Sequence, residues 1–187
     1  IFEHLARWSA VHVTEDRGDL LIAPDAVRDL PRDFARRLLI AALRWVSGTD
    51  HSPRGDKVLQ AMSRLEAPGR FTLHGCTMTV GGEGLRIARE PEAATRAAPG
   101  SPGEVWDGRW RITGPGTGEV RALTEAGLAH CPDWRATGLP RSSLAASPAV
   151  WDGDKLLAAP LARAGSADWR AELAQGRDDF RGSLISR

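Results

Sequence analysis

The 187-residue chain has no tyrosine, no asparagine, two cysteines and only two lysines, Lys57 and Lys155. Two cysteines are too few for a disulfide framework, which favours free thiols in a reducing compartment. The longest apolar run, 38–43, is far shorter than the roughly 20 residues that a membrane-spanning helix needs, and no signal peptide is visible. We therefore expect a cytoplasmic location without membrane association.

The charges nearly cancel, with 25 lysines and arginines against 24 acidic residues and a net charge of +1. Such a chain has no overall field that would attract nucleic acid, so any RNA contact must come from local arginine clusters. The hydrophobic content of 42% is enough to bury a core in one domain or two. The chain opens at Ile1 within an apparent helical pattern, which indicates a segment of a longer protein.

The first half of the sequence alternates between strand and helix signals. Short extended runs at 10–15 and 20–23 flank a turn-rich link and predict a hairpin. Apolar residues at helical spacing predict a helix over 30–46 and a second one after Ser52 and Pro53, together a helical hairpin. Alternating residues over 71–87 predict another hairpin, kinked near Gly75.

From Glu90 to Gly103 the composition shifts to alanine, proline, glycine and serine, which indicates a linker. Beyond it, the similar segments 105–108 and 150–153 each end in Asp-Gly and predict twin hairpins in one sheet. A helix is expected over 167–173, and the tail 175–187 is expected to fray. The overall prediction is an α+β fold with a helical, hairpin-bearing domain (1–92), a linker (93–103) and a small mixed α/β domain (104–187).

No catalytic residue and no metal site is predicted. The segment from Ser47 to Ser52 departs from a pyrophosphate loop at Thr49 and follows a helix, whereas a phosphate loop follows a strand. Two histidine and cysteine pairs lack the spacing that presents two ligands to one tetrahedral ion, and buried thiols are the favoured interpretation. These pairs are His74 with Cys76 and His130 with Cys131. A free-standing thiol or metal enzyme stays an alternative.

Trp134 is the best candidate for an exposed tryptophan, because its segment lacks the periodicity of a buried element. An indole face can stack on any base, and Arg135 and Arg141 are suited to phosphate contacts. On the helix over 30–46, Arg37 and Arg44 share a polar face, and Asp33 can pair with Arg37 one turn away. Solvated surface arginines are the alternative interpretation at both places.

Three stretches together resemble the C-terminal region of bacterial tRNA(Ile)-lysidine synthetases. The helices and hairpin between Leu30 and Ile87 resemble the substrate-binding domain of that family. The run Trp106-Asp107-Gly108-Arg109-Trp110 resembles the start of its last domain, and the stretch from Leu139 to Pro160 is similar to its ending. The resemblance covers most of the chain.

The resemblance implies that the intact enzyme uses ATP to adenylate the wobble cytidine of an isoleucine tRNA and then joins lysine to it. ATP and magnesium would bind in an N-terminal catalytic domain that has no counterpart here, and this part would bind no cofactor. Its expected partners are tRNA, that N-terminal domain and a second copy of the chain. The residues expected to contact tRNA are Arg37, Arg44, Arg109, Arg111, Trp134, Arg135, Arg141 and Lys155. The alternative is a protein-interaction or dimerisation module without RNA binding.

Overall fold

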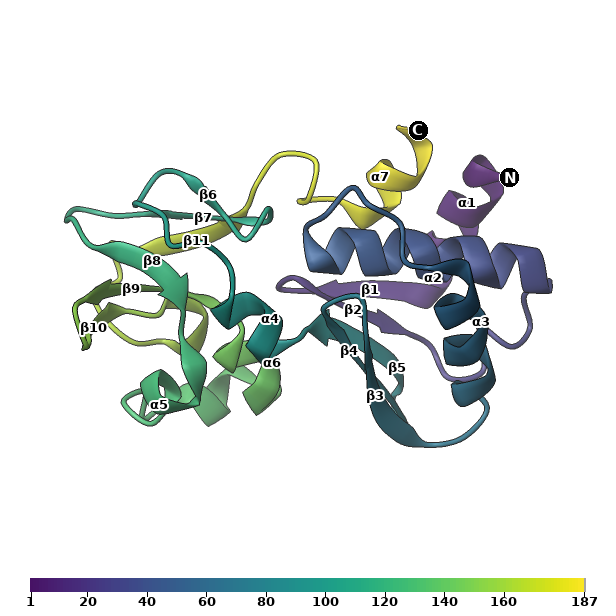
Figure 1. The fold of residues 1–187 in the computed structure, drawn as a ribbon, viewed down its shortest axis with the longest axis horizontal. Coiled ribbons are helices and arrows are strands. Elements are labelled where there is room, and N and C mark those ends of the chain that lie inside the picture. The colour runs from purple at the N-terminus through teal and green to yellow at the C-terminus, as the bar shows by residue number, and fades with distance from the viewer. Residues whose placement is uncertain (187) are drawn as a thin grey trace. The chain divides into compact units, whose positions relative to one another are not determined.

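The computed structural model describes residues 1–186, which form two compact units (Figure 1). Unit 1 combines residues 1–88 with the chain from Gly176 onward, and unit 2 comprises residues 89–175. The predicted bounds of 1–92, 93–103 and 104–187 do not coincide with these units. The predicted linker lies inside unit 2, and the C-terminal tail belongs to unit 1.

Unit 1 is a five-stranded sheet with helices. Its strands follow the order β1-β2-β5-β4-β3, and the pairings β1 with β2, β2 with β5, and β3 with β4 are antiparallel. Figure 1 shows the long helix α2 running along one face of this sheet. In chain order the elements are α1 (Phe2–His12), β1 (Val13–Asp16), β2 (Asp19–Ile22), α2 (Arg32–Ser47), α3 (Gly55–Arg64), β3 (Gly69–Leu73), β4 (Cys76–Gly81), β5 (Gly84–Arg89) and α7 (Phe180–Ile185).

The core of unit 1 is built from the apolar stripe that the sequence places on α2. Leu38, Leu39, Leu43, Trp45 and Val46 are at most 1% exposed. Residues three, four and seven apart share one face of a helix, so this spacing turns a continuous apolar surface toward the sheet. The predicted helix over 30–46 is therefore confirmed, and it begins at Arg32, directly after Pro31.

The tail forms a docked helix instead of fraying. Phe180 and Leu184, one helical turn apart, are 1% and 0% exposed, and the Phe180 ring meets the Trp45 indole edge-on with centroids 5.8 Å apart. The Phe180 N–H donates to a carboxylate oxygen of Glu15 at 2.7 Å, and the Arg177 guanidinium donates to Asp50 at 2.9 Å. The expectation of a frayed tail was wrong because it weighed overall polarity above two well-spaced apolar residues.

The expected kink near Gly75 is a full reversal of the chain. Leu73 pairs with Cys76 across a two-residue turn, and both His74 and Gly75 have positive φ, 56° and 70°. Positive φ at both central positions matches the strand twist of a tight hairpin. Residues 69–89 consequently form a three-stranded meander.

Unit 2 holds two three-stranded sheets, ordered β10-β9-β8 and β11-β7-β6, with short helices. Strand β10 pairs antiparallel with β9, β8 with β9, β6 with β7, and β11 with β7. The elements are α4 (Pro91–Thr95), β6 (Val105–Trp106), β7 (Trp110–Thr113), β8 (Glu119–Ala122), α5 (Thr124–Leu128), the 3-10 helix η1 (Trp134–Thr137), α6 (Arg141–Ala145), β9 (Pro148–Asp152), β10 (Lys155–Ala158), the 3-10 helix η2 (Pro160–Ala162) and β11 (Arg170–Leu173).

The two Asp-Gly hairpins exist, but they belong to different sheets. The turn at Asp107 and Gly108 joins β6 to β7, whereas the turn at Gly153 joins β9 to β10. The helix expected over 167–173 was wrong, because β11 covers 170–173 and pairs with β7. The expected linker is also ordered: Ala94 of α4 is 1% exposed and Gly100 bridges to Val120.

The α+β fold class is confirmed, with helices and antiparallel strand pairs in both units. Trp106, Trp110 and Trp151 are buried in unit 2, at 2%, 5% and 6% exposure. Among residues 1–186, every helix is too short or too polar to cross a bilayer.

Candidate nucleic-acid interface

A hollow of about 250 Å³ in unit 2 brings together three of the eight residues expected to contact tRNA. It lies where α5 ends, η1 follows and α6 begins. We call it the α5–η1 hollow. Its lining residues are Leu128, Ala129, Cys131, Pro132, Trp134, Arg135 and Arg141.

The short helix η1 fixes the Trp134 side of the α5–η1 hollow. The Thr137 hydroxyl donates to the Trp134 carbonyl at 2.6 Å and accepts the Leu139 N–H at 3.1 Å. Gly138 ends η1 with φ of 75°, a conformation that glycine adopts without a steric penalty. Trp134 is half-buried and packs against the apolar core formed by Leu139 and its neighbours. The indole therefore has a defined position at the edge of the hollow.

The two arginines of the hollow differ in what they contact. The Arg135 guanidinium carbon lies 4.6 Å from the centroid of the Trp134 ring, a cation–π arrangement, and Arg135 is otherwise exposed. Arg141 forms an ion pair with Glu125 of α5, and the two side chains are 58% and 55% exposed. An ion pair this exposed contributes at most about 1 kcal/mol, so a phosphate can displace the carboxylate.

Both cysteines have the surroundings of structural thiols. Cys131 is 1% exposed, its thiol donates to the Gly127 carbonyl at 3.5 Å, and burial raises the pKa of Cys131. Cys76 is fully buried and its thiol donates to the Leu43 carbonyl at 3.5 Å. The raised pKa makes the Cys131 thiol a poor nucleophile, which speaks against a thiol enzyme that uses this residue. In the described part of the chain, no three histidine, cysteine or acidic side chains gather as a metal ion would require.

Arg109 does not lie at the surface. Its side chain is 2% exposed, and its backbone connects the β6–β7 turn to Ala174, whose N–H donates to the Arg109 carbonyl at 2.6 Å. The sequence placed Arg109 directly after an Asp-Gly turn, where side chains are usually solvated, and gave no sign of this burial. We therefore withdraw Arg109 as an RNA contact.

Arg111 and Lys155 are exposed in unit 2 but lie outside the α5–η1 hollow. Arg111 donates to the Gly103 carbonyl at 2.7 Å. Lys155 lines a separate hollow of about 360 Å³ together with His130 and Asp154. The acidic group beside Lys155 offsets its charge, so this second hollow is a weaker candidate for an anionic ligand.

Arg37 and Arg44 lie on α2 of unit 1. The predicted pairing of Arg37 with Asp33 is confirmed, with Nε 2.9 Å from the carboxylate. Arg44 is 19% exposed and lies 4.0 Å from Asp50. Both arginines therefore have a carboxylate neighbour, and they belong to a different unit from the α5–η1 hollow.

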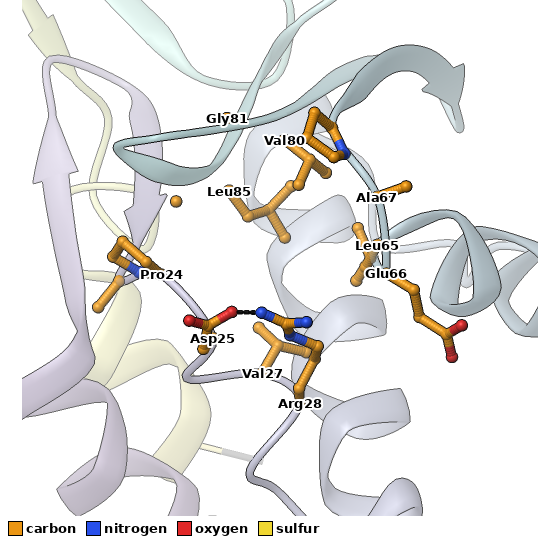
Figure 2. Close-up of a pocket in the computed structure, with 13 residues that line it drawn as sticks. Pro24, Asp25, Val27, Arg28, Leu65, Glu66, Ala67, Val80, Gly81 and Leu85 are labelled. Carbon is orange, nitrogen blue, oxygen red and sulfur yellow. Dashed lines mark ion pairs between the residues drawn. The ribbon is translucent and has the colours of Figure 1, made fainter.

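A further hollow in unit 1, of about 150 Å³, was not foreseen from the sequence. Figure 2 shows Asp25 and Arg28 joined by an ion pair beside the apolar side chains of Leu65, Val80 and Leu85. Two carboxylates of the lining, Asp25 and Glu66, outnumber the one guanidinium of Arg28, so this hollow presents less suitable chemistry for RNA than the α5–η1 hollow. None of the eight predicted contact residues lines it.

Sequence reasoning missed the apolar floor of the α5–η1 hollow and the Glu125 partner of Arg141. Leu128, Ala129 and Pro132 give no individual signal, because such residues are common in any loop after a helix. The position of α6 against α5 brings Glu125 to Arg141, and only the folded chain shows this contact. Among the features of this hollow, the sequence indicated the pair Trp134 and Arg135 because these two residues are adjacent in the chain.

The fold and this candidate interface define a two-unit α+β protein with an arginine-rimmed hollow. No family model matches the chain, and no solved structure matches it. Two curated relatives do, both named tRNA(Ile)-lysidine synthase. The protein from Ruegeria pomeroyi is 45% identical over 174 residues, which is 91% of this chain and 41% of the relative. The protein from Caulobacter vibrioides is 36% identical over 104 residues, which is 51% of this chain and 25% of the relative.

The resemblance predicted from the sequence is therefore confirmed: this chain is a homologue of the tRNA(Ile)-lysidine synthases. The chain spans less than half the length of the curated relatives that it matches.

Proposed function

We propose that this chain is the tRNA-positioning part of a tRNA(Ile)-lysidine synthase, acting in the cytoplasm beside a catalytic part that binds ATP and magnesium. The observation that supports this most directly is the joint placement of Trp134, Arg135 and Arg141 around one hollow. These residues offer a flat aromatic surface and two phosphate-binding groups within a single unit. The printed names of both relatives, tRNA(Ile)-lysidine synthase, support tRNA as the ligand of this proposal.

Charge sets the character of this binding. Unit 2 contains ten lysines and arginines against eleven acidic residues, so its overall field does not attract RNA. Contacts must be local, and each phosphate that an arginine neutralises contributes to the salt dependence of binding. We expect the 187-residue chain to bind tRNA weakly and the affinity to fall steeply as salt increases.

The test is fluorescence anisotropy of labelled isoleucine tRNA with the 187-residue chain over a series of salt concentrations. The double variant Arg135→Ala and Arg141→Ala removes two phosphate contacts. We expect it to bind at least about tenfold more weakly, because hydrogen bonds to charged groups contribute about 1.5–3 kcal/mol each. The slope of log affinity against log salt should fall by about 1.4–1.8. Arg163→Ala, an exposed arginine of unit 2 outside the hollow, is the matched control.

Glu125→Gln makes the test more specific, because it alters the carboxylate that competes with phosphate for Arg141 and leaves Arg141 itself unchanged. The Glu125 carboxylate forms an ion pair with the Arg141 guanidinium, and a neutral glutamine leaves that guanidinium available to a phosphate. We expect up to about fivefold tighter tRNA binding, in line with the small contribution of an exposed ion pair. If Glu125→Gln and the double arginine variant both bind like the wild type, the α5–η1 hollow is not the tRNA interface.

A protein-interaction role is the second candidate, because exposed apolar side chains occur on the adjoining helices α1 and α7. Val11 is 77% exposed and Ile185 is 56% exposed. A homodimer through these helices would bury both. Sedimentation equilibrium of the wild type and of Val11→Ser tests it: a concentration-dependent dimer lost in the variant supports this role, and a monomer throughout refutes it.

A further inference from the structure

We propose that the α5–η1 hollow accepts a single unstacked nucleobase of single-stranded RNA, with Arg135 and Arg141 on the phosphates that flank it. This inference rests on the proposed function and goes beyond it, since phosphate positioning alone requires no hollow. The ligand class is a single-stranded nucleotide segment and not a continuous duplex.

The lining favours a base over a bare phosphate. Leu128, Ala129 and Pro132 contribute apolar surface, and the Trp134 indole forms one edge. An isolated phosphate gains nothing from apolar walls, whereas a nucleobase removed from its stack needs them to shield its faces from water. The volume of about 250 Å³ is of the size of one small planar group and too small for a helix or strand.

A flat stacking surface already exists at the hollow. The Arg135 guanidinium carbon lies 4.6 Å from the centroid of the Trp134 ring, so a planar cationic group and an aromatic ring lie together at the hollow. RNA bases stack on arginine planes as well as on aromatic rings. The Thr137 hydroxyl accepts the Leu139 N–H and donates to the Trp134 carbonyl, which holds the backbone that carries both side chains.

The two arginines reach the hollow from different elements, which suits a ligand that carries phosphates on both sides. Arg135 comes from η1 and Arg141 from the first position of α6. A nucleotide within a strand has one phosphate before its sugar and one after it, and a guanidinium can hold each. A peptide side chain has no such flanking anions, so the charge arrangement favours RNA over a protein partner.

The experiment fills the hollow without altering its charges. Ala129 is exposed, lines the hollow and has ordinary helical backbone angles, so Ala129→Leu should fold and occupy part of the space. Ala126→Leu, an exposed alanine of α5 outside the lining, is the matched control. The probes are a single-stranded RNA oligonucleotide carrying one 2-aminopurine and the same oligonucleotide paired with its complement.

We expect the single-stranded probe to bind with a change in 2-aminopurine emission. Ala129→Leu should weaken that binding about tenfold, the lower range of what one stacked base contributes, and abolish the emission change. Ala126→Leu should behave like the wild type. The duplex should bind more weakly and lose little with Ala129→Leu, because its bases stay stacked.

Each other outcome identifies which idea fails. If Ala129→Leu leaves both affinity and emission unchanged while the double arginine variant loses tRNA binding, the base hollow is wrong and phosphate positioning stands. If neither tRNA nor the oligonucleotide binds, the proposed function fails and this inference fails with it. If the hollow instead takes a side chain of another protein molecule, Ala129→Leu reduces self-association without affecting RNA binding, which overturns the inference.

Discussion

Replacing Phe180 with alanine should unfold unit 1 far more easily, although the residue lies near the end of the sequence. The Phe180 ring is 1% exposed and meets the buried Trp45 indole edge-on. A buried phenylalanine replaced by alanine costs about 3–5 kcal/mol, which includes the cavity left behind and an aromatic contact of about 0.5–1.5 kcal/mol. Since a whole domain is stable by only about 5–15 kcal/mol, this loss is a large share of the total.

The measurement is urea unfolding followed by intrinsic fluorescence, with hydrogen exchange to locate the effect. With a urea dependence of about 1–3 kcal/mol per molar, the midpoint should fall by at least about 1 M. Amides of α2 should lose protection, because Trp45 belongs to that helix. Ile185→Ala on the same helix is the control, since a 56% exposed side chain should change stability by no more than about 0.5 kcal/mol. Unaltered protection of α2 together with an unmoved midpoint would refute the docking of the tail.

Three further expectations concern unit 2. Thr124 has φ of 67° although it is β-branched, and its hydroxyl accepts the Gly127 N–H at 3.2 Å. Thr124→Asn keeps a hydrogen-bond acceptor and tolerates this backbone conformation, so urea unfolding should show a free energy of unfolding that is about 1 kcal/mol higher. Thr124→Ala should show no such increase. The Arg89 guanidinium donates two hydrogen bonds, of 2.7 and 2.8 Å, to the Asp107 carboxylate. Arg89→Ala would leave this buried carboxylate without its partner and should lower the free energy of unfolding by about 3–5 kcal/mol. A loss below about 1 kcal/mol in urea unfolding would contradict this. Cys131 should react with a thiol reagent at pH 8 much more slowly than a free thiol, because its raised pKa lowers the thiolate fraction. Unfolding in urea should restore the reaction. Fast labelling of the folded chain would show that the Cys131 side chain is not buried.

The elements whose signals are local could be predicted from the sequence. The apolar residues of α2 recur at helical spacing, which can be recognised within the 16 residues of the helix itself. The Asp-Gly turns can likewise be recognised from two adjacent residues, because these residues suit the positive φ of a tight turn. Which strands pair with each other, in contrast, depends on segments that are far apart in the sequence. The sequence could not tell that β6 and β9 enter different sheets, because each strand offers similar apolar residues to any neighbour.

Propensity misled where tertiary pairing decides the structure. The alanine-containing stretch 167–173 suits a helix, yet β11 forms there because β7 has an open edge that needs a partner. The same limit applies to the candidate interface. Trp134 and Arg135 were found because they are adjacent, whereas the burial of Arg109 and the Glu125 contact of Arg141 arise from packing between distant segments.

These contacts also bear on the tRNA-binding role that we propose for a nearly neutral chain. A uniformly basic surface would bind any polyanion, whereas an arginine held by a carboxylate gives up that contact only to a ligand that also fits its surroundings. Arg37 pairs with Asp33 and Arg141 with Glu125, and both pairs are exposed enough to exchange. Under the proposed function, the acidic partners would lower non-specific affinity and leave shape and stacking at the α5–η1 hollow to select the ligand. On this argument, Glu125→Gln should tighten binding to unrelated RNA more than to isoleucine tRNA, so that affinity rises while discrimination falls.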